Sequence, residues 1–207
     1  MSDTLYIAEP GDNEEFSFAG FVARLGVSAG SPATFFCRPE GNLESAWNIW
    51  QQEWLIPVLG PSFSETYRLG MNSRVLEICD QDNALDQQFS DSMRTRSQDA
   101  GRLFLEGKSE MQGHREWKKF ADKVFAKESP GHVTTVFALH TVLYRLPLLP
   151  ALSAYCWFEF RCGSSPKGKM DENWGIDIFN SVLPHLAVAA SGINNDNNDG
   201  PGTLRAI

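Results

Sequence analysis

The spacing of apolar residues predicts helices along most of the chain from residue 42 onward. Asn42 is a suitable N-cap for the first of them. Its apolar side recurs at steps of three and four and consists of Ala46, Trp47, Trp50 and Trp54. Such a stripe is typical of a core-facing helix, although tryptophan is also enriched at protein interfaces. Pro57 and then Pro61 are expected to close this helix.

The same periodicity continues over the next stretch. A second helix is expected to begin near Ser62 or Ser64, and its apolar positions are Tyr67, Met71, Val75 and Ile78. Residues 80–83 have the composition of a turn, and Asp82 is a suitable cap for a third helix. The apolar positions of that third helix are Leu85, Phe89, Met93, Leu103 and Phe104. A short basic helix is expected within residues 113–127, with Trp117, Phe120 and Val124 on one face.

Residues 133–146 are ambiguous, because their β-branched content also suits a buried strand. Their length and lack of alternation favour a buried helix. Residues 148–160 and 177–191 are expected to form the last two helices. The prediction is an all-α fold: a compact single-domain bundle of about six to eight helices over residues 1–191. The polar, glycine-rich segment 192–207 is expected to be a disordered tail.

Charge and composition narrow the class of protein. The 207 residues carry 18 Lys and Arg against 26 Asp and Glu, which gives a net charge of −8, and 42% of them are hydrophobic. An acidic chain of this kind is expected to bind nucleic acid and anionic membranes poorly, because both carry negative charge. The apolar stretch 133–158 contains Arg145 and two prolines near its middle, which disfavours a membrane span. The N-terminus does not resemble a signal peptide, and the four cysteines form no C-x-x-C pair. We therefore expect a cytoplasmic protein with reduced cysteines.

No recognisable catalytic or metal-binding motif occurs in the sequence. Phosphate-binding loops, nucleophile elbows and H-E-x-x-H are absent, and the four histidines are scattered singly. His132 and His140 are eight residues apart, which on a helix separates them by about 80° around the axis, too far for a routine chelate. A core or capping role is expected for each histidine. The prediction is a non-enzymatic protein with no cofactor and no bound metal, suited to binding or scaffolding.

Three stretches resemble the family of urease accessory proteins called UreF. The first carries Arg94, Ser97 and Gly101 on one expected helix, followed by an apolar pair. The second is long and gapless, and it places its matches at the family's spacings: His132, Phe137, Leu146-Pro147 and the run 151–155, which ends in Tyr155. The third matches the framework of the family's N-terminal signature at Phe16, Gly20, Phe21 and Gly26, while Ala23 and Arg24 replace its His-Ser pair.

The resemblance implies an all-α, usually dimeric protein that is not itself an enzyme. UreF proteins link a UreD-type protein, also called UreH, to the GTPase UreG, and help to insert nickel into apo-urease. By that resemblance, the partner-binding positions are expected at Arg94, Ser97, Gly101, His132 and Tyr155, with helix packing as the alternative role for each.

Two alternatives stay open. The chain could be a diverged relative with partners unrelated to urease. It could also be a small helical ligand-binding or enzymatic domain that uses a pocket near His132, His140 and the aromatic residues.

Overall fold

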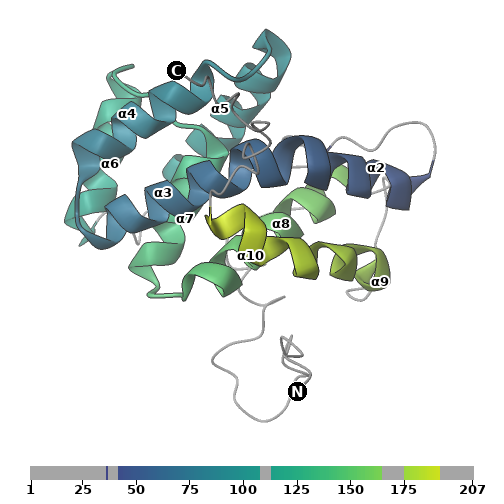
Figure 1. Cartoon of the computed structure of the whole chain (residues 1–207). Helices are drawn as coiled ribbons and strands as arrows, with labels where there is room; N and C mark the ends of the chain where they lie inside the picture. Colours follow the sequence, from purple (N-terminus) through teal and green to yellow (C-terminus); the bar gives the residue numbers. More distant parts are fainter. Residues whose placement is uncertain (1–35, 37–41, 108–112, 165–174, 192–207) are drawn as a thin grey trace, which may run out of the picture.

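The computed structural model describes residue 36 and residues 42–107, 113–164 and 175–191. Its first helical run starts at α2 (Leu43–Trp50), continues through a π-helix, η1 (Gln51–Leu59), and ends with α3 (Gly60–Met71). Figure 1 shows these three elements as one continuous rod along the molecule. The predicted N-cap is confirmed, because the Asn42 side chain accepts hydrogen bonds from the backbone N–H groups of Glu44 and Ser45 at 2.8 and 3.3 Å.

The expectation that Pro57 and Pro61 close the first helix is wrong. Pro57 lies inside the π-helix, and Pro61 lies in the first turn of α3. In an α-helix, a proline lacks the N–H for the ladder and its ring crowds the carbonyl four residues earlier. The wider i→i+5 spacing of a π-helix relieves that conflict without ending the rod. Pro61 lies where the π-helix passes directly into α3, and it does not end the helical run either.

The remaining elements follow in short order. They are α4 (Val75–Asp86), α5 (Asp91–Glu106), α6 (Arg115–Phe125), α7 (Val133–Leu143), α8 (Leu148–Ser164), α9 (Ile176–Phe179), the 3₁₀ turn η3 (Asn180–Val182) and α10 (Leu183–Ser191). No strand occurs in the described part of the chain. The all-α prediction is confirmed, and the described residues form seven helical rods when adjoining elements are joined. The predicted tail and the N-terminal signature lie outside the described residues.

Several predicted boundaries between residues 62 and 104 are wrong. The expected second helix is two helices, since α3 ends at Met71 and α4 begins at Val75. Residues 80–83 belong to α4, so the predicted turn is absent there, and the chain instead breaks at residues 87–90. An apolar period that runs smoothly across a tight reversal cannot reveal it, because the residues on both sides still face the same core.

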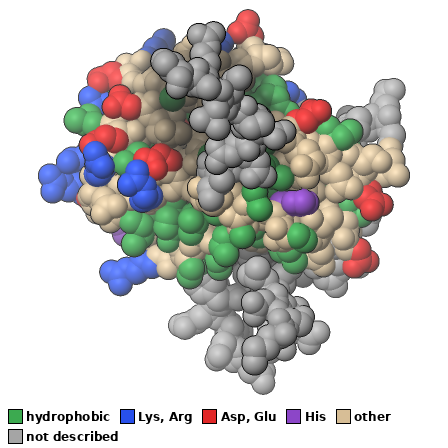
Figure 2. Space-filling view, in the orientation of Figure 1, with side chains coloured by type: hydrophobic (Ala, Val, Ile, Leu, Met, Phe, Trp, Pro, Cys, Tyr) green, Lys and Arg blue, Asp and Glu red, His purple; other side chains and the backbone are tan. Residues whose placement is uncertain are grey.

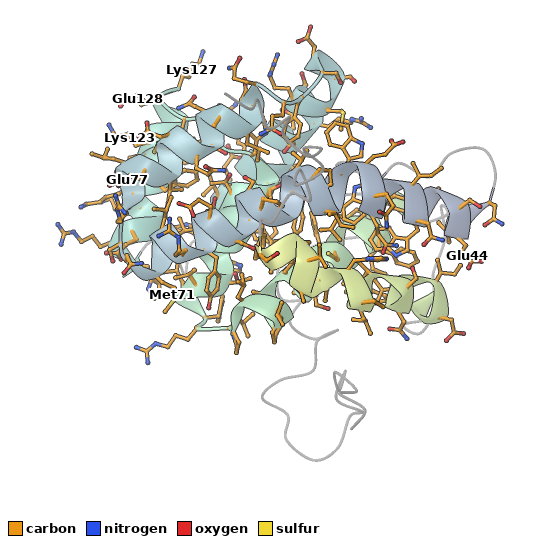
Figure 3. The ribbon with its side chains drawn as sticks, viewed as in Figure 1. Glu44, Met71, Glu77, Lys123, Lys127 and Glu128 are labelled. Atoms are coloured by element: carbon orange, nitrogen blue, oxygen red, sulfur yellow. The ribbon has the colours of Figure 1, made fainter. Side chains whose placement is uncertain are left out.

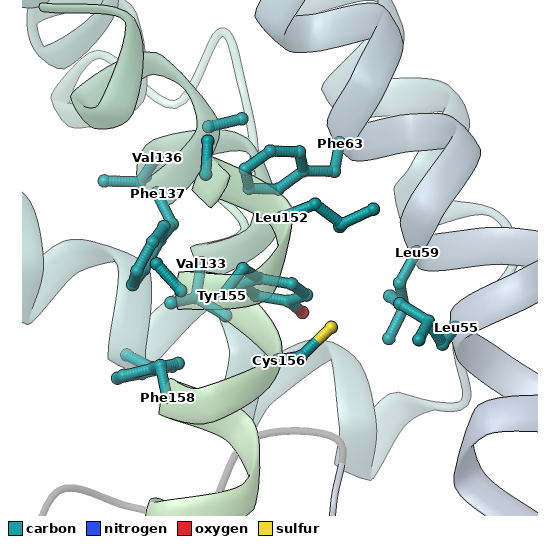
Figure 4. Packing of buried hydrophobic residues seen from close by; sticks show 14 of the residues in the cluster. Leu55, Leu59, Phe63, Val133, Val136, Phe137, Leu152, Tyr155, Cys156 and Phe158 are labelled. Carbon is teal, nitrogen blue, oxygen red and sulfur yellow. The ribbon is translucent and has the colours of Figure 1, made fainter. Parts of the chain in front are cut away.

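The ambiguous stretch 133–146 forms α7, the central helix of the fold. Every residue from 133 to 142 is buried, and α7 packs against α3, α5 and α8. A helix covered on all sides needs no polar face, which explains why the sequence shows no amphipathic period there. Figure 4 shows the core beside it: Tyr155 and Leu152 of α8 lie between Phe137 of α7 and Phe63 of α3.

Three helices end in the same way, with a residue other than glycine in the left-handed conformation. Ser73, Lys127 and Arg145 have φ angles of 57°, 61° and 55° after α3, α6 and α7. At each end the next residue's N–H reaches back to a carbonyl five positions earlier, for example from Glu128 to Lys123 at 2.9 Å. This is the Schellman arrangement, in which glycine is the usual occupant. Figure 3 shows Lys123, Lys127 and Glu128 at the end of α6.

The surface is polar in some regions and apolar in others. On the face shown in Figure 2, charged side chains gather at the end of the molecule where α3, α4 and α6 lie, and apolar side chains form a band nearer the middle.

Among the described residues, no helix combines the length and apolar character that crossing a bilayer requires. The three cysteines in the described part, Cys79, Cys156 and Cys162, are free thiols.

Candidate functional site

Buried polar side chains form a junction where α4 and α5 meet the turn that leads into α7. Its centre is the carboxylate of Asp82, which is fully buried. One oxygen accepts hydrogen bonds from the Ser129 hydroxyl at 2.7 Å and from the Gly131 N–H at 2.6 Å. The other accepts from the His132 N–H at 3.1 Å. Three donors on one carboxylate fix the turn at the entrance to α7.

The prediction that Asp82 caps a third helix along the chain is wrong. Asp82 lies inside α4, and the free N–H groups that its carboxylate satisfies lead into α7, about fifty residues further on. Backbone donors before a helix must find acceptors, and a carboxylate there also interacts favourably with the positive end of the helix dipole. A sequence pattern can propose a capping residue only for the helix that follows it directly.

One turn further along α4, Asp86 holds the second part of the junction. Its carboxylate lies 3.0 Å from His132 Nε2 and 2.9 Å from Gln98 Nε2. The Nε of Arg94 is 3.0 Å from its other oxygen. The Asp86 side chain is 16% exposed, so these contacts are screened less than a surface ion pair. Asp86 therefore links α4 to α5 and to the start of α7.

His132 is neutral in this setting. Its burial lowers its pKa, while the nearby carboxylates of Asp82 and Asp86 act in the opposite direction. A carboxylate accepts hydrogen bonds, so Nε2 carries the proton that it donates to Asp86. The ring also packs edge-on against Phe89, with centroids 5.0 Å apart. The predicted capping or core role fits both observations: His132 is the N-cap residue of α7 and is fully buried.

Arg94 and Ser97 connect α5 to both neighbours. Arg94 donates from one terminal nitrogen to the carbonyl oxygens of Asp86 and Phe89, at 3.1 and 3.2 Å, and so satisfies backbone acceptors at the end of α4. Its other terminal nitrogen pairs with Asp91 at 2.8 Å. The Ser97 hydroxyl accepts from the Val133 N–H at 3.3 Å, in the first turn of α7.

The structure thus brings four of the five predicted site residues together. Ser97, Gly101 and His132 are buried and the Arg94 side chain is 31% exposed, all within the α4–α5–α7 junction. Tyr155 lies apart from them in α8 and is fully buried. Each has a packing or hydrogen-bonding role within the described residues, which was the alternative to partner contact. Partner binding by these residues stays a prediction.

Tyr155 belongs to a separate buried chain of hydrogen bonds. Its hydroxyl donates to the buried carboxylate of Glu159 at 2.8 Å and lies 2.9 Å from the Thr134 hydroxyl. Glu159 also accepts from the Phe36 N–H at 3.3 Å. Burial raises the pKa of Tyr155 well above its usual value. This network ties the segment at Phe36 to α7 and α8.

Sequence reasoning missed Asp82 and Asp86 as junction residues. A signal was present, because Ile78, Asp82, Leu85 and Phe89 are spaced by four, three and four residues, so an acidic side chain occupies the apolar stripe of a helix. A carboxylate in that position requires buried donors.

Beside the junction a polar pocket of about 350 Å³ opens between α4, α5 and the end of α6. Its lining is Asn83, Asp86, Gln98, Asp99, Arg102, Val124, Lys127, Ser129 and Pro130.

Within the residues described, no group of three or more His, Cys, Asp or Glu side chains is arranged to hold a metal ion. Burial raises the pKa of Cys79 and Cys156, and that of Cys162 to about 12, so these thiols are protonated at neutral pH.

The chain matches no family model, no curated protein and no solved structure.

Proposed function

We propose that this protein is a non-catalytic scaffold of the UreF type. In this role it would link a UreD/UreH-type accessory protein to the GTPase UreG for nickel insertion into apo-urease, acting in the cytoplasm as a homodimer. The observation that supports the proposal is the convergence of Arg94, Ser97, Gly101 and His132. These residues come from two separate stretches of the resemblance, and they meet in one junction.

The convergence matters because it gives the matched residue types one shared physical reason. Arg94 donates from one terminal nitrogen to two carbonyl oxygens at the end of α4. Ser97 accepts a hydrogen bond from the first turn of α7, and His132 donates one to Asp86 of α4. Gly101 allows the turn before α7 to approach α5. Arg94, Ser97 and Gly101 share one face of α5 through their spacing, and the fold brings His132, from the other stretch of the resemblance, to that same face. A fixed helical junction beside an open polar pocket is also a suitable base for binding a partner protein.

Co-expression with the cognate UreD-type and UreG-type proteins tests the proposal. We expect the chain to co-elute with them in a complex whose mass, measured by light scattering during size-exclusion chromatography, includes two copies of this protein. Addition of apo-urease and nickel should then raise urease activity above that of a mixture lacking the chain.

Two variants make the result specific. Arg94→Gln replaces the guanidinium with a shorter, neutral amide and removes the ion pairs with Asp86 and Asp91, and we expect it to weaken the complex. Arg74→Gln removes an exposed ion pair with Glu77 away from the junction and should not. A wild-type chain that is folded by circular dichroism yet binds neither partner would overturn the urease role and favour a diverged relative with other partners.

A further inference from the structure

The polar pocket between α4, α5 and α6 contains charges that the fold itself does not use. Asp86 is already engaged by His132, Gln98 and Arg94. By contrast, Arg102 and Lys127 are exposed, and their side chains form no ion pair or hydrogen bond with other described residues. Two cations that line one pocket without a carboxylate partner are free to bind an anionic group.

Lys127 occupies a backbone position that glycine would fill more easily. It is the left-handed residue at the end of α6, with φ of 61°. A side chain there costs conformational energy that glycine would avoid. The helix end therefore does not require lysine for its geometry, and the residue's side chain lines the pocket instead. Figure 3 shows Lys127 at this end of α6 beside Lys123 and Glu128, which pair with each other.

The rest of the lining indicates which anion would fit. Asp99 precedes Arg102 by three positions on α5, is exposed, and forms no ion pair within the part of the chain described. Together with Asp86, it makes the pocket unfavourable for a doubly charged phosphate. The carboxylate of Asp99 can, however, accept a hydrogen bond from a neutral N–H. A ligand with one carboxylate and an adjoining amide N–H would therefore satisfy Arg102, Lys127 and Asp99 together.

We propose that this pocket binds the free carboxylate of a polypeptide C-terminus, or of an N-acylated amino acid with the same chemistry. Arg102 and Lys127 hold the carboxylate, and Asp99 accepts the hydrogen bond of the preceding amide. The proposal does not depend on the urease role, because the site lies within this chain and can be tested without any partner.

The test is a titration of the ¹⁵N-labelled full chain followed by NMR. Acetyl-triglycine provides the free carboxylate, its C-terminal amide is the matched uncharged probe, butyrate provides a single carboxylate without the amide, and inorganic phosphate provides a different anion. We expect saturable shifts with acetyl-triglycine for amides of α5 and of the 127–130 turn. Binding should weaken as salt is added, because the contacts are exposed charge pairs.

Variants separate binding from folding. Lys127→Gly suits the left-handed backbone, so we expect it to keep or raise the melting temperature while weakening acetyl-triglycine binding about tenfold, the effect of one lost charge-assisted contact. Arg102→Gln should do the same. Lys118→Gln, an exposed α6 residue outside the pocket, should bind like the wild type.

Five results would overturn the proposal. Four of them are the absence of saturable shifts with acetyl-triglycine, equal binding of the acid and the amide, preference for inorganic phosphate, and unchanged affinity in both pocket variants. The fifth is tighter binding of butyrate than of acetyl-triglycine, because butyrate lacks the amide that Asp99 is proposed to recognise.

Discussion

Gly101 of α5 and Gly131 of the turn before α7 are in direct backbone contact. A Cβ at position 101 would overlap the carbonyl oxygen of Gly131 and would lie 3.0 Å from the N of Val133. Gly131 has φ of 76°, and a side chain there would meet Val124 of α6. Two glycines therefore bring α5 and the turn close enough for Ser97 to reach the Val133 N–H.

Gly101→Ala is expected to destabilise the protein, although alanine favours a helix over glycine by about 1 kcal/mol. The overlap is with backbone, which cannot move aside as a flexible side chain would, so we expect a net loss of about 1–3 kcal/mol in the free energy of unfolding. Denaturation in urea measures it. Gly70→Ala is the control, because a Cβ there meets only side-chain atoms of Val142 and Leu139 at 3.3 Å or more. Equal stability of the two variants would show that the contact at Gly101 is looser than described.

Asp82→Ala is expected to lower the free energy of unfolding by about 3 kcal/mol, since three buried donors lose a charged acceptor. Asp82→Asn keeps one acceptor oxygen and should lose less. Asp80→Ala, on the exposed side of the same helix, should change stability by less than about 0.5 kcal/mol. Chemical denaturation of the three variants gives the order, and a small effect of Asp82→Ala would mean that water replaces the carboxylate in the turn.

The stability of the protein should depend on pH through His132. Its pKa in the folded state lies below the ordinary value of 6.5, chiefly because of burial. Below pH 6.5 the unfolded chain therefore binds more protons at this site than the folded chain does. Stability is fully present above pH 6.5 and falls as the pH is lowered toward the folded pKa, by at most about 1.4 kcal/mol per pH unit.

His132→Gln isolates this contribution, because its amide N–H can replace Nε2–H toward Asp86 without titrating. We expect the wild type to lose more stability than the variant between pH 7 and 5, as measured by urea denaturation at each pH. Parallel pH profiles for the two proteins would contradict the shifted pKa of His132.

Arg145→Gly should stabilise the protein. Arg145 is exposed and left-handed, with φ of 55°, in the Schellman ending of α7. Glycine adopts this conformation without the steric cost of a Cβ, so we expect a gain of up to about 1 kcal/mol. Arg145→Ala removes the same side chain but keeps the Cβ and should give no gain. Thermal unfolding compares the two, and a gain in both variants would assign the effect to the charge of Arg145 and not to its backbone.

Local patterns predicted the elements better than their ends. The Asn42 cap and the buried face of α6, with Trp117, Phe120 and Val124, follow from side chains that act on their own or neighbouring turns. The continuation of the helical run past Pro57 and the break at residues 87–90 do not follow from such local effects. Each depends on the neighbours against which the segment packs. Similarly, the sequence singled out Arg94, Ser97, Gly101 and His132 through a resemblance, but it could not show that they meet or that Asp82 and Asp86 hold them.

By itself, the sequence determined the helical class, the apolar faces and the mixture of acidic and polar residues, because these depend on residue types at short spacings. Tertiary structure alone decided that α7 is the buried centre and that Asp82 caps it from fifty residues away. It also placed Arg102 and Lys127 around one pocket. The physical reason is that a buried carboxylate, a close glycine contact and an unpaired charge are defined by neighbours in space, and the spacing along the chain does not specify those neighbours.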